Sequence, residues 1–206
     1  MSRSSVGTFS ILAISPDSKL MGIAVASGSA SVGDRVPHAK PKAGIIATQA
    51  YTNVAYGIKG LELLAKGLSP TEALDRLLME DRENELRQVA LMDFTRRKAV
   101  FTGARTPEWH GETIGESYIV IGNLLTGKKV LSSMAEEFER SSGDLAWRML
   151  MALKAGSEGG GDRRGEKSAA LMTISTEKVE HEIKVDLNDN PIQELRRLLE
   201  HLREKE

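Results

Sequence analysis

A threonine placed directly after a glycine, at the start of an apolar segment, is the residue whose chemistry is best defined. Thr8 follows Gly7 and opens the run Thr8–Ile14. If the bond between the two residues were cut, Thr8 would carry a free α-amine with a pKa of about 8 beside its hydroxyl, and one residue would supply both nucleophile and base. The pair would equally suit the ordinary start of a β-strand, because threonine favours strands. Nucleophilic attack on an amide is therefore one of two interpretations.

Cations and small hydroxyl residues follow the next apolar run. Ser27 ends that run, and Arg35 and Lys40 come shortly after it. A cation beside the amine of Thr8 would lower the pKa of that amine and favour its neutral, basic form. We expect Lys40 to take this catalytic role, with Arg35 as the other candidate, and Ser27 to bind the substrate. A polar surface loop would need the same residue types.

Amide side chains stand where two further predicted strands end. Gln49 and Asn53 follow one strand, and Asn123 follows another. Their dipoles can hold an amide or a carboxylate, and an asparagine can donate a hydrogen bond to an oxyanion. We expect Gln49 and Asn53 to bind the substrate, and Asn123 or a backbone N–H near Ser27 or Gln49 to stabilise the oxyanion. A polar strand exit or a helix cap would use the same side chains.

A glycine-rich segment, 156–167, carries the last candidates. Asp162, Arg163 and Arg164 lie within it, and it lacks the Gly-Lys-Ser/Thr ending of a phosphate-binding loop. Arginine can clamp a carboxylate or a phosphate with two hydrogen bonds, so Arg163 and Arg164 are predicted to bind the substrate. Asp162 is predicted to tune the amine of Thr8. A charged surface turn is the competing interpretation.

Composition excludes several other chemistries. The 206 residues contain no cysteine, which removes thiol nucleophiles, disulfides and cysteine-ligated metals. The histidines are scattered, at His38, His110, His181 and His201, so we predict no metal site and no cofactor. A net charge of −1 gives no general attraction for nucleic acid, and no segment approaches the roughly 20 apolar residues of a membrane span. Binding to nucleic acid or to a membrane is therefore not expected.

The elements that would position these residues mix hairpins with paired helices. Strands are predicted over 8–14, 20–27, 44–48, 87–94, 98–102, 117–122, 169–174 and 182–187. Helical spacing is found near 61–65, from Pro70, over 130–138 and 145–153, and from Pro191. Residues 28–43 are predicted to form a long loop. Hairpins favour antiparallel sheets, because parallel neighbours need a crossover each time, and the order of elements indicates a layered α+β fold.

The ends of the chain suggest how it is organised. Residues 1–7 lack the apolar stretch of a signal peptide and are predicted to be a leader in a cytoplasmic protein. Residues 8–206 are expected to form one domain, because nothing in the sequence marks a linker.

Several short segments, taken together and in order, resemble a known family. They are Thr8-Phe-Ser-Ile, Ala24-Val-Ala-Ser27, Ala47-Thr-Gln49-Ala, Tyr56-Gly57-Xaa-Xaa-Gly60-Leu, Gly122-Asn123 and Gly160-Gly-Asp162-Arg-Arg-Gly165, followed by Ser168-Ala-Ala. The chain resembles the family called domain of unknown function 1028, within the Ntn-hydrolase-like superfamily. The resemblance implies a four-layer α-β-β-α sandwich and hydrolysis of amide bonds by an N-terminal residue, with Thr8 at the matching position. Members often begin Met-Thr-Phe-Ser, whereas here activation would require cleavage between Gly7 and Thr8.

Three functions follow as hypotheses. The leading one is an amidohydrolase of the N-terminal nucleophile type that acts on a small or peptide-like substrate. The second is a binding module without catalysis, in which Arg163, Arg164 and Gln49 hold a small anion or a peptide end while the leader stays attached. The third is a structural subunit, because layered folds of this kind often self-associate, and a homo-oligomer is expected.

Overall fold

The computed structural model describes residues 7–205, and its strands form two antiparallel sheets. The larger sheet has the order β10-β9-β2-β1-β8-β7, and the smaller has the order β3-β4-β5-β6. The strands are β1 Thr8–Ile14, β2 Met21–Ser27, β3 Pro37–Lys40, β4 Gly44–Ala50, β5 Arg87–Met92, β6 Lys98–Thr102, β7 Gly111–Ile114, β8 Tyr118–Asn123, β9 Ser168–Ile174 and β10 Val179–Val185. Every ladder within the two sheets is antiparallel, as the hairpins predict.

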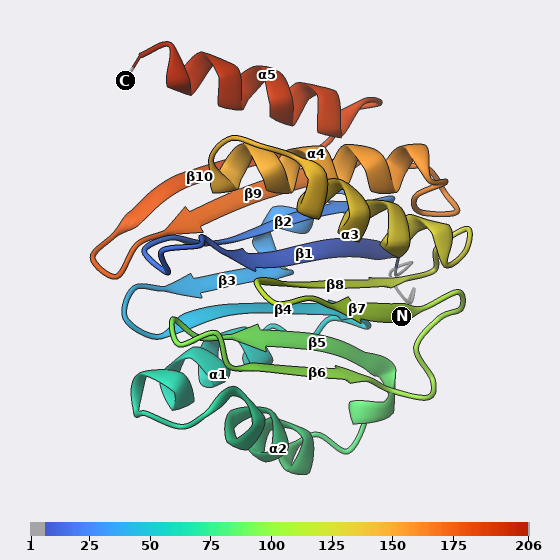
Figure 1. The fold of residues 1–206 in the computed structure, drawn as a ribbon. Helices are drawn as coiled ribbons and strands as arrows, with labels where there is room; N and C mark the ends of the chain where they lie inside the picture. The colour runs from blue at the N-terminus through green and yellow to red at the C-terminus, as the bar shows by residue number, and fades with distance from the viewer. Residues whose placement is uncertain (1–6, 206) are drawn as a thin grey trace.

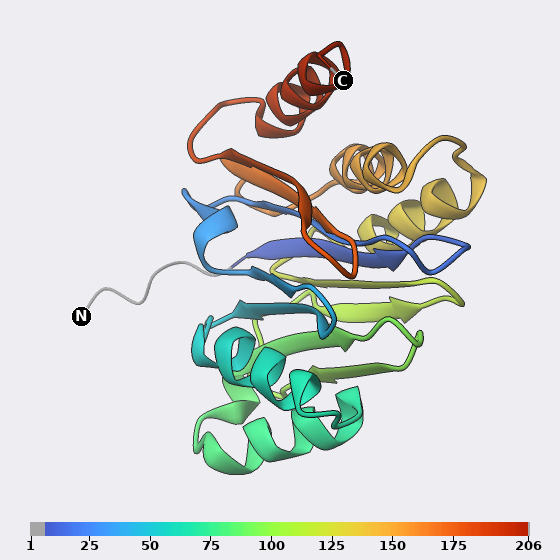
Figure 2. The same ribbon diagram turned by 90° about the vertical axis from the view of Figure 1, so that its left-hand side faces the viewer.

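Helices cover the outer face of each sheet and complete four layers (Figure 1). The helices are α1 Ala55–Ala65, α2 Pro70–Glu80, α3 Lys129–Arg140, α4 Leu145–Glu158 and α5 Pro191–Arg203. The view turned by 90° shows α3, α4 and α5 on the side of the larger sheet and α1 and α2 on the side of the smaller sheet (Figure 2). The predicted α-β-β-α sandwich of two mainly antiparallel sheets is confirmed. No helix within residues 7–205 is both long enough and apolar enough to cross a membrane.

The central strands are buried on both faces, because one face meets helices and the other meets the opposite sheet. Along β1, Phe9 and Ile11 pack in the cluster beneath α3 and α4, whereas Leu12 packs in the cluster between the sheets. Side chains two residues apart share one face of a strand. Thr8 and Ser10 therefore lie on the same face as Leu12, at the end of β1 and between the two sheets.

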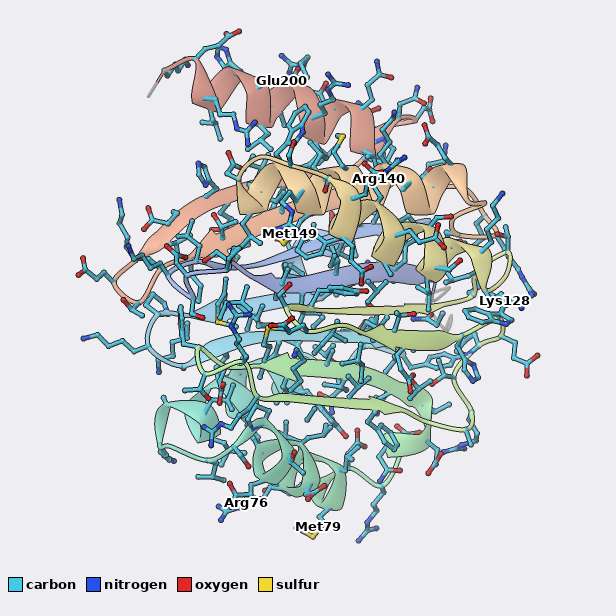
Figure 3. The ribbon with its side chains drawn as sticks, in the orientation of Figure 1. Arg76, Met79, Lys128, Arg140, Met149 and Glu200 are labelled. Carbon is cyan, nitrogen blue, oxygen red and sulfur yellow. The ribbon has the colours of Figure 1, made fainter. Side chains whose placement is uncertain are left out.

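Local signals in the sequence account for several elements. The helix predicted from Pro70 begins there, with a capping box between Ser69 and Glu72, a kind of cap that contributes about 1 kcal/mol. Close packing of α4 on the larger sheet depends on Gly22, where a Cβ would collide with Met149 (Figure 3). Met149 is fully buried.

The structure differs from the prediction in three segments. Residues 28–43 do not form a loop throughout, because they contain a short 3-10 helix, Val32–Asp34, and the edge strand β3. Proline and charged residues are tolerated at a sheet edge, so β3 lacks the apolar pattern of a central strand. The edge strand β7 alternates half-buried and exposed residues and was not predicted, and β10 begins at Val179 rather than at residue 182.

Candidate functional site

The carbonyl group of Gly7 is the centre of a buried polar cluster. Its oxygen accepts hydrogen bonds from the Thr8 hydroxyl at 2.5 Å, from Ser27 Oγ at 2.5 Å and from Arg164 Nη2 at 3.2 Å. The two hydroxyls are 3.3 Å apart. We call Thr8, Ser27, Asp162, Arg164 and the Gly7 carbonyl the Thr8 cluster. Two donors other than Thr8 thus polarise the bond that joins Gly7 to Thr8.

Asp162 orients Arg164 toward this carbonyl. The Asp162 side chain is fully buried, and both of its oxygens are satisfied. Oδ1 accepts from the backbone N–H and Nε of Arg164 at 2.9 and 3.0 Å, and Oδ2 accepts from Arg164 Nη2 at 2.8 Å and from the Gly28 N–H at 2.9 Å. A charge-assisted pair held at so many points has little freedom, so the guanidinium is fixed against Gly7.

The turn that carries Asp162 depends on the glycine before it. Gly161 has a φ of 58°, a left-handed conformation that residues with a Cβ rarely adopt. Glu166 Oε1 accepts from the Asp162 N–H at 3.0 Å, and Ser157 at the end of α4 donates to the other oxygen of Glu166 at 3.0 Å. The glycine-rich segment is therefore a tightly bonded turn that inserts one carboxylate beneath the end of β1.

A second guanidinium reaches the cluster through two serines. Arg35 Nη2 donates to Ser29 Oγ at 2.9 Å, and Ser29 Oγ lies 2.9 Å from Ser27 Oγ. Burial lowers the pKa of Arg35, the neighbouring Asp34 acts in the opposite sense, and the charge of Arg164 lowers that pKa further. Two positive groups therefore approach the Gly7 carbonyl from different segments of the chain.

A network of amides between the sheets lies behind Thr8. Gln49 Nε2 donates to the Thr8 carbonyl oxygen at 3.3 Å and to Gln88 Oε1 at 2.8 Å. The same Gln88 oxygen accepts from Asn123 Nδ2 at 3.1 Å, and Gln49 Oε1 accepts from Ser10 Oγ at 2.6 Å. Asn123 Oδ1 is buried and has no hydrogen-bond partner in the structure. The network ties β1, β4, β5 and β8 together where the cluster sits.

Backbone strain marks the same end of the sheets. Ala50, directly after Gln49, has a φ of 66°, and Leu124, directly after Asn123, has a φ of 53°. Residues with a Cβ adopt this region only at a cost in free energy, and such positions gather at functional sites. Both strands therefore turn sharply just after an amide of the network.

The structure gathers most of the predicted residues, and three lie elsewhere. Lys40 requires a correction: it is exposed and pairs with Gly44, at the far end of β4 from Gln49, about 17 Å along the strand. Asn53 accepts from the Ala55 N–H and donates to Asp81, so its side chain is bonded at the start of α1. The exposed Arg163 donates to the Leu125 carbonyl. Arg35, the other cation that the sequence suggested, is linked to Ser27 of the cluster through Ser29.

Sequence reasoning missed three contributors to the site: Ser10, Ser29 and Gln88. The last is a fully buried glutamine on a strand whose following residues are apolar, Val89 to Met92. A buried polar side chain needs partners, so its position inside such a run was a usable signal. Ser10 carried none, because its partner Gln49 comes from another segment. Ser29 bonds to Ser27 and Arg35 within the segment rich in small hydroxyl residues, but nothing in that segment marked Ser29 above its neighbours.

Two further observations concern a possible metal site and a surface groove. Among residues 7–205, no three His, Cys, Asp or Glu side chains are grouped so that they could hold a metal ion. A surface groove of about 840 Å³ lies between α4 and α5, lined by Leu150, Met151, Glu194 and Arg197 among others. None of the residues of the Thr8 cluster lines it, so the groove is separate from the cluster.

Comparison with known proteins places the chain in a family. The sequence model of a family described as "Family of unknown function (DUF1028)" matches residues 8–195. The chain belongs to the DUF1028 family. A crystal structure of a DUF1028 protein from Silicibacter pomeroyi is 33% identical, with a TM-score of 0.89 over 95% of this chain and 85% of that one.

A more distant similarity to a solved structure also covers most of both chains. Anbu, the ancestral β-subunit from Yersinia bercovieri, is 12% identical over 94% of this DUF1028 chain and 93% of that chain, with a TM-score of 0.43. No curated protein matches the chain. The predicted family is thus confirmed, while the family itself has no known function.

Proposed function

We propose that this DUF1028 protein is an amide hydrolase of the N-terminal nucleophile type, within the Ntn-hydrolase-like superfamily, and that Thr8 is its nucleophile. The observation that carries the proposal is the surroundings of the Gly7 carbonyl. Its oxygen meets the Thr8 hydroxyl, a serine hydroxyl and a guanidinium. Donors aimed at a carbonyl oxygen stabilise the negative charge that forms there when a nucleophile adds to the carbon.

The first reaction would cut the chain itself. Thr8 Oγ forms a bond to the carbonyl carbon of Gly7, and the negative charge that develops on the oxygen is stabilised by Ser27 and Arg164. The C–N bond then breaks, the hydroxyl proton passes to the leaving nitrogen, and an ester joins Gly7 to Thr8 Oγ. Water hydrolyses the ester, which leaves a carboxylate on Gly7 and a free amine and hydroxyl on Thr8.

The same groups would then act on a substrate. The free α-amine of Thr8 takes the proton of the hydroxyl as Oγ attacks the substrate amide, and it returns the proton to the leaving amine. Water then hydrolyses the acyl ester on Thr8 Oγ, which releases the acid and restores the hydroxyl. The substrate carbonyl takes the place of the Gly7 carbonyl, within reach of Ser27 and Arg164. Nearby positive charge favours the neutral, basic form of the amine, and Arg35 supplies such charge in place of the predicted Lys40.

The carboxylate of Asp162 and the amides have supporting roles in this proposal. Asp162 fixes Arg164 through its hydrogen bonds. Gln49 holds the Thr8 carbonyl, and Gln88 orients Gln49 and Asn123 together. We also propose that Asn123 helps to stabilise the oxyanion, as the sequence predicts. In this structure its amide N–H donates to Gln88.

Intact-mass measurement combined with one substitution tests the proposal. The purified full chain is expected to lose residues 1–7 with time and to begin at Thr8, and Thr8→Ala is expected to keep its full mass and to hydrolyse no amide. Residues 1–6 of the predicted leader lie outside the described residues. A wild-type chain that keeps its full mass during long incubation, or a Thr8→Ala protein that turns over amides as fast as wild type, would overturn the proposal.

The binding module is less well supported. Arg163 donates to a backbone carbonyl, Arg164 to Asp162 and Gly7, and Gln49 to Gln88 and Thr8. The predicted anion-binding side chains are thus committed to partners inside the protein.

The cytoplasmic location, the single domain and the homo-oligomer stay predictions. Cell fractionation tests the location, limited proteolysis tests the single domain, and a sizing column tests the homo-oligomer.

A further inference from the structure

The α-carbon of Gly7 is pressed against the charged pair of the Thr8 cluster. A Cβ built on Gly7 would lie 2.5 Å from Asp162 Oδ2 and 2.6 Å from Arg164 Nη2. Both atoms are held by several hydrogen bonds, so neither can move aside cheaply. If a substrate acyl group takes the place of Gly7, as the proposed function requires, the carbon next to its carbonyl has no room for a branch on this side.

The charges around the same position are not balanced. Arg164 is neutralised by Asp162, which lies beside it. Arg35 forms no ion pair with a carboxylate of residues 7–205, and the adjacent Asp34 is bonded to Lys184 at 3.1 Å. Arg35 is half-buried and donates to the Ser29 hydroxyl and to two backbone carbonyls. The charge of Asp34 acts on Arg35, but without a direct ion pair, and a partly desolvated guanidinium in this state favours the binding of an anion.

The path from the Gly7 carbonyl to Arg35 is short. It runs from the carbonyl oxygen to Ser27 Oγ at 2.5 Å, to Ser29 Oγ at 2.9 Å and to Arg35 Nη2 at 2.9 Å. The guanidinium therefore lies no farther from the carbonyl oxygen than three consecutive hydrogen bonds, a span that a short methylene chain with a terminal carboxylate can bridge.

We propose that the substrate is an ω-amide of a dicarboxylic acid: its acyl chain has no branch next to the carbonyl and ends in a carboxylate that Arg35 binds. This inference rests on the proposed function and adds the substrate class. Hydrolysis would release an amine and the free dicarboxylic acid, with water as the only other reactant. Arg35 is then a residue that determines specificity, apart from its effect on Thr8 through the two serines.

Paired synthetic substrates test the specificity. The p-nitroanilides of succinic and glutaric acid are compared with compounds in which the free carboxylate is replaced by a neutral amide of the same shape. We expect kcat/KM to favour the acids by about 10- to 100-fold, and Arg35→Gln to bring that ratio close to one, because a hydrogen bond to a charged group is lost. Arg35→Lys is expected to keep part of the preference, and a methyl group next to the reacting carbonyl is expected to slow hydrolysis.

Controls separate this inference from the proposed function. Arg76→Gln changes an exposed arginine on α2, in the outer helical layer beyond the smaller sheet (Figure 3), and is expected to leave the ratio unchanged. Equal kcat/KM for the acids and the neutral amides, or an Arg35→Gln protein that loses activity on both equally, would overturn the substrate class while leaving an active amidase.

Direct binding gives a readout that needs no turnover. Calorimetric titration of the chain that begins at Thr8 with glutarate is expected to show binding that Arg35→Gln weakens about 10- to 100-fold and Arg76→Gln leaves intact. Binding of glutarate by a chain that hydrolyses nothing would support the anion site and reject the hydrolase. If the wild-type chain that begins at Thr8 does not bind glutarate, the inference is wrong.

Discussion

Replacing Ser27 by alanine removes one of the two groups that would stabilise negative charge on the Gly7 oxygen during cleavage. Ser27 Oγ donates to that oxygen at 2.5 Å, and the remaining donor apart from Thr8 is Arg164 Nη2 at 3.2 Å. Ser27 also accepts from the Ser29 N–H at 3.1 Å. The substitution therefore affects both the reaction and the fold, and the two effects have to be measured separately.

The expected magnitudes follow from these contacts. Loss of one oxyanion donor costs about 3 kcal/mol of transition-state stabilisation, so cleavage before Thr8 is expected to slow by about 100- to 1000-fold. The remaining donor, Arg164, keeps the rate above zero. Loss of the ground-state hydrogen bonds of Ser27 is expected to lower the free energy of unfolding by about 1 to 2 kcal/mol.

A time course of intact mass measures the cleavage, and urea denaturation measures the stability. Ser15→Ala is the matched control, because Ser15 donates to Asp17 and accepts from the Leu20 N–H in the turn at the other end of β1. It is expected to lose similar stability and to keep the rate of cleavage. If Ser27→Ala cleaves as fast as Ser15→Ala, Ser27 does not stabilise the oxyanion and the reasoning from the Gly7 contacts is refuted.

Three further predictions concern stability and processing. Gly7→Ala puts a Cβ 2.5 Å from Asp162 Oδ2, so we expect the free energy of unfolding in urea to fall by about 1 to 3 kcal/mol. Cleavage before Thr8, followed by intact mass, is expected to slow. Unchanged stability and cleavage would contradict the tight fit. Gln88→Leu leaves two buried amide donors without their acceptor and is expected to cost about 2 to 4 kcal/mol, whereas a loss below about 0.5 kcal/mol would show that the network is dispensable. For Asp81, burial raises the pKa, but hydrogen bonds, chiefly from Arg87, lower it more, from 3.8 to about 2. A carboxyl with a lowered pKa in the folded chain adds stability above pH 3.8 that is lost as the pH falls toward 2. Asp81→Asn is therefore expected to destabilise the protein more at pH 7 than at pH 2, and an equal loss at both pH values would contradict the ion pair.

Much of the fold could be predicted from local pattern. The β1–β2 hairpin, the start of α2 at Pro70 and the course of α5 follow from alternation, capping and helical spacing, which depend on residues close together in the sequence. The hairpin also sets Thr8 and Ser27 side by side at one end of two paired strands, since the register pairs Phe9 with Ala26. These parts of the site were therefore accessible from the sequence.

The partners of Thr8 from other layers were decided by tertiary structure. Gln88 meets Gln49 because β4 and β5 pair in one sheet, with Gln49 opposite Gln88. It meets Asn123 of β8 because the two sheets stack face to face, and stacking depends on how whole surfaces pack. Tertiary structure also decided which of the two predicted cations, Arg35 or Lys40, lies near the cluster. The two residues are five positions apart, and the edge strand β3 runs away from the cluster, so it carries Lys40 to the far end of the sheet and leaves Arg35 beside the serines. Residue type suggested the chemistry, but the pairing of distant segments determined which side chains reach Thr8.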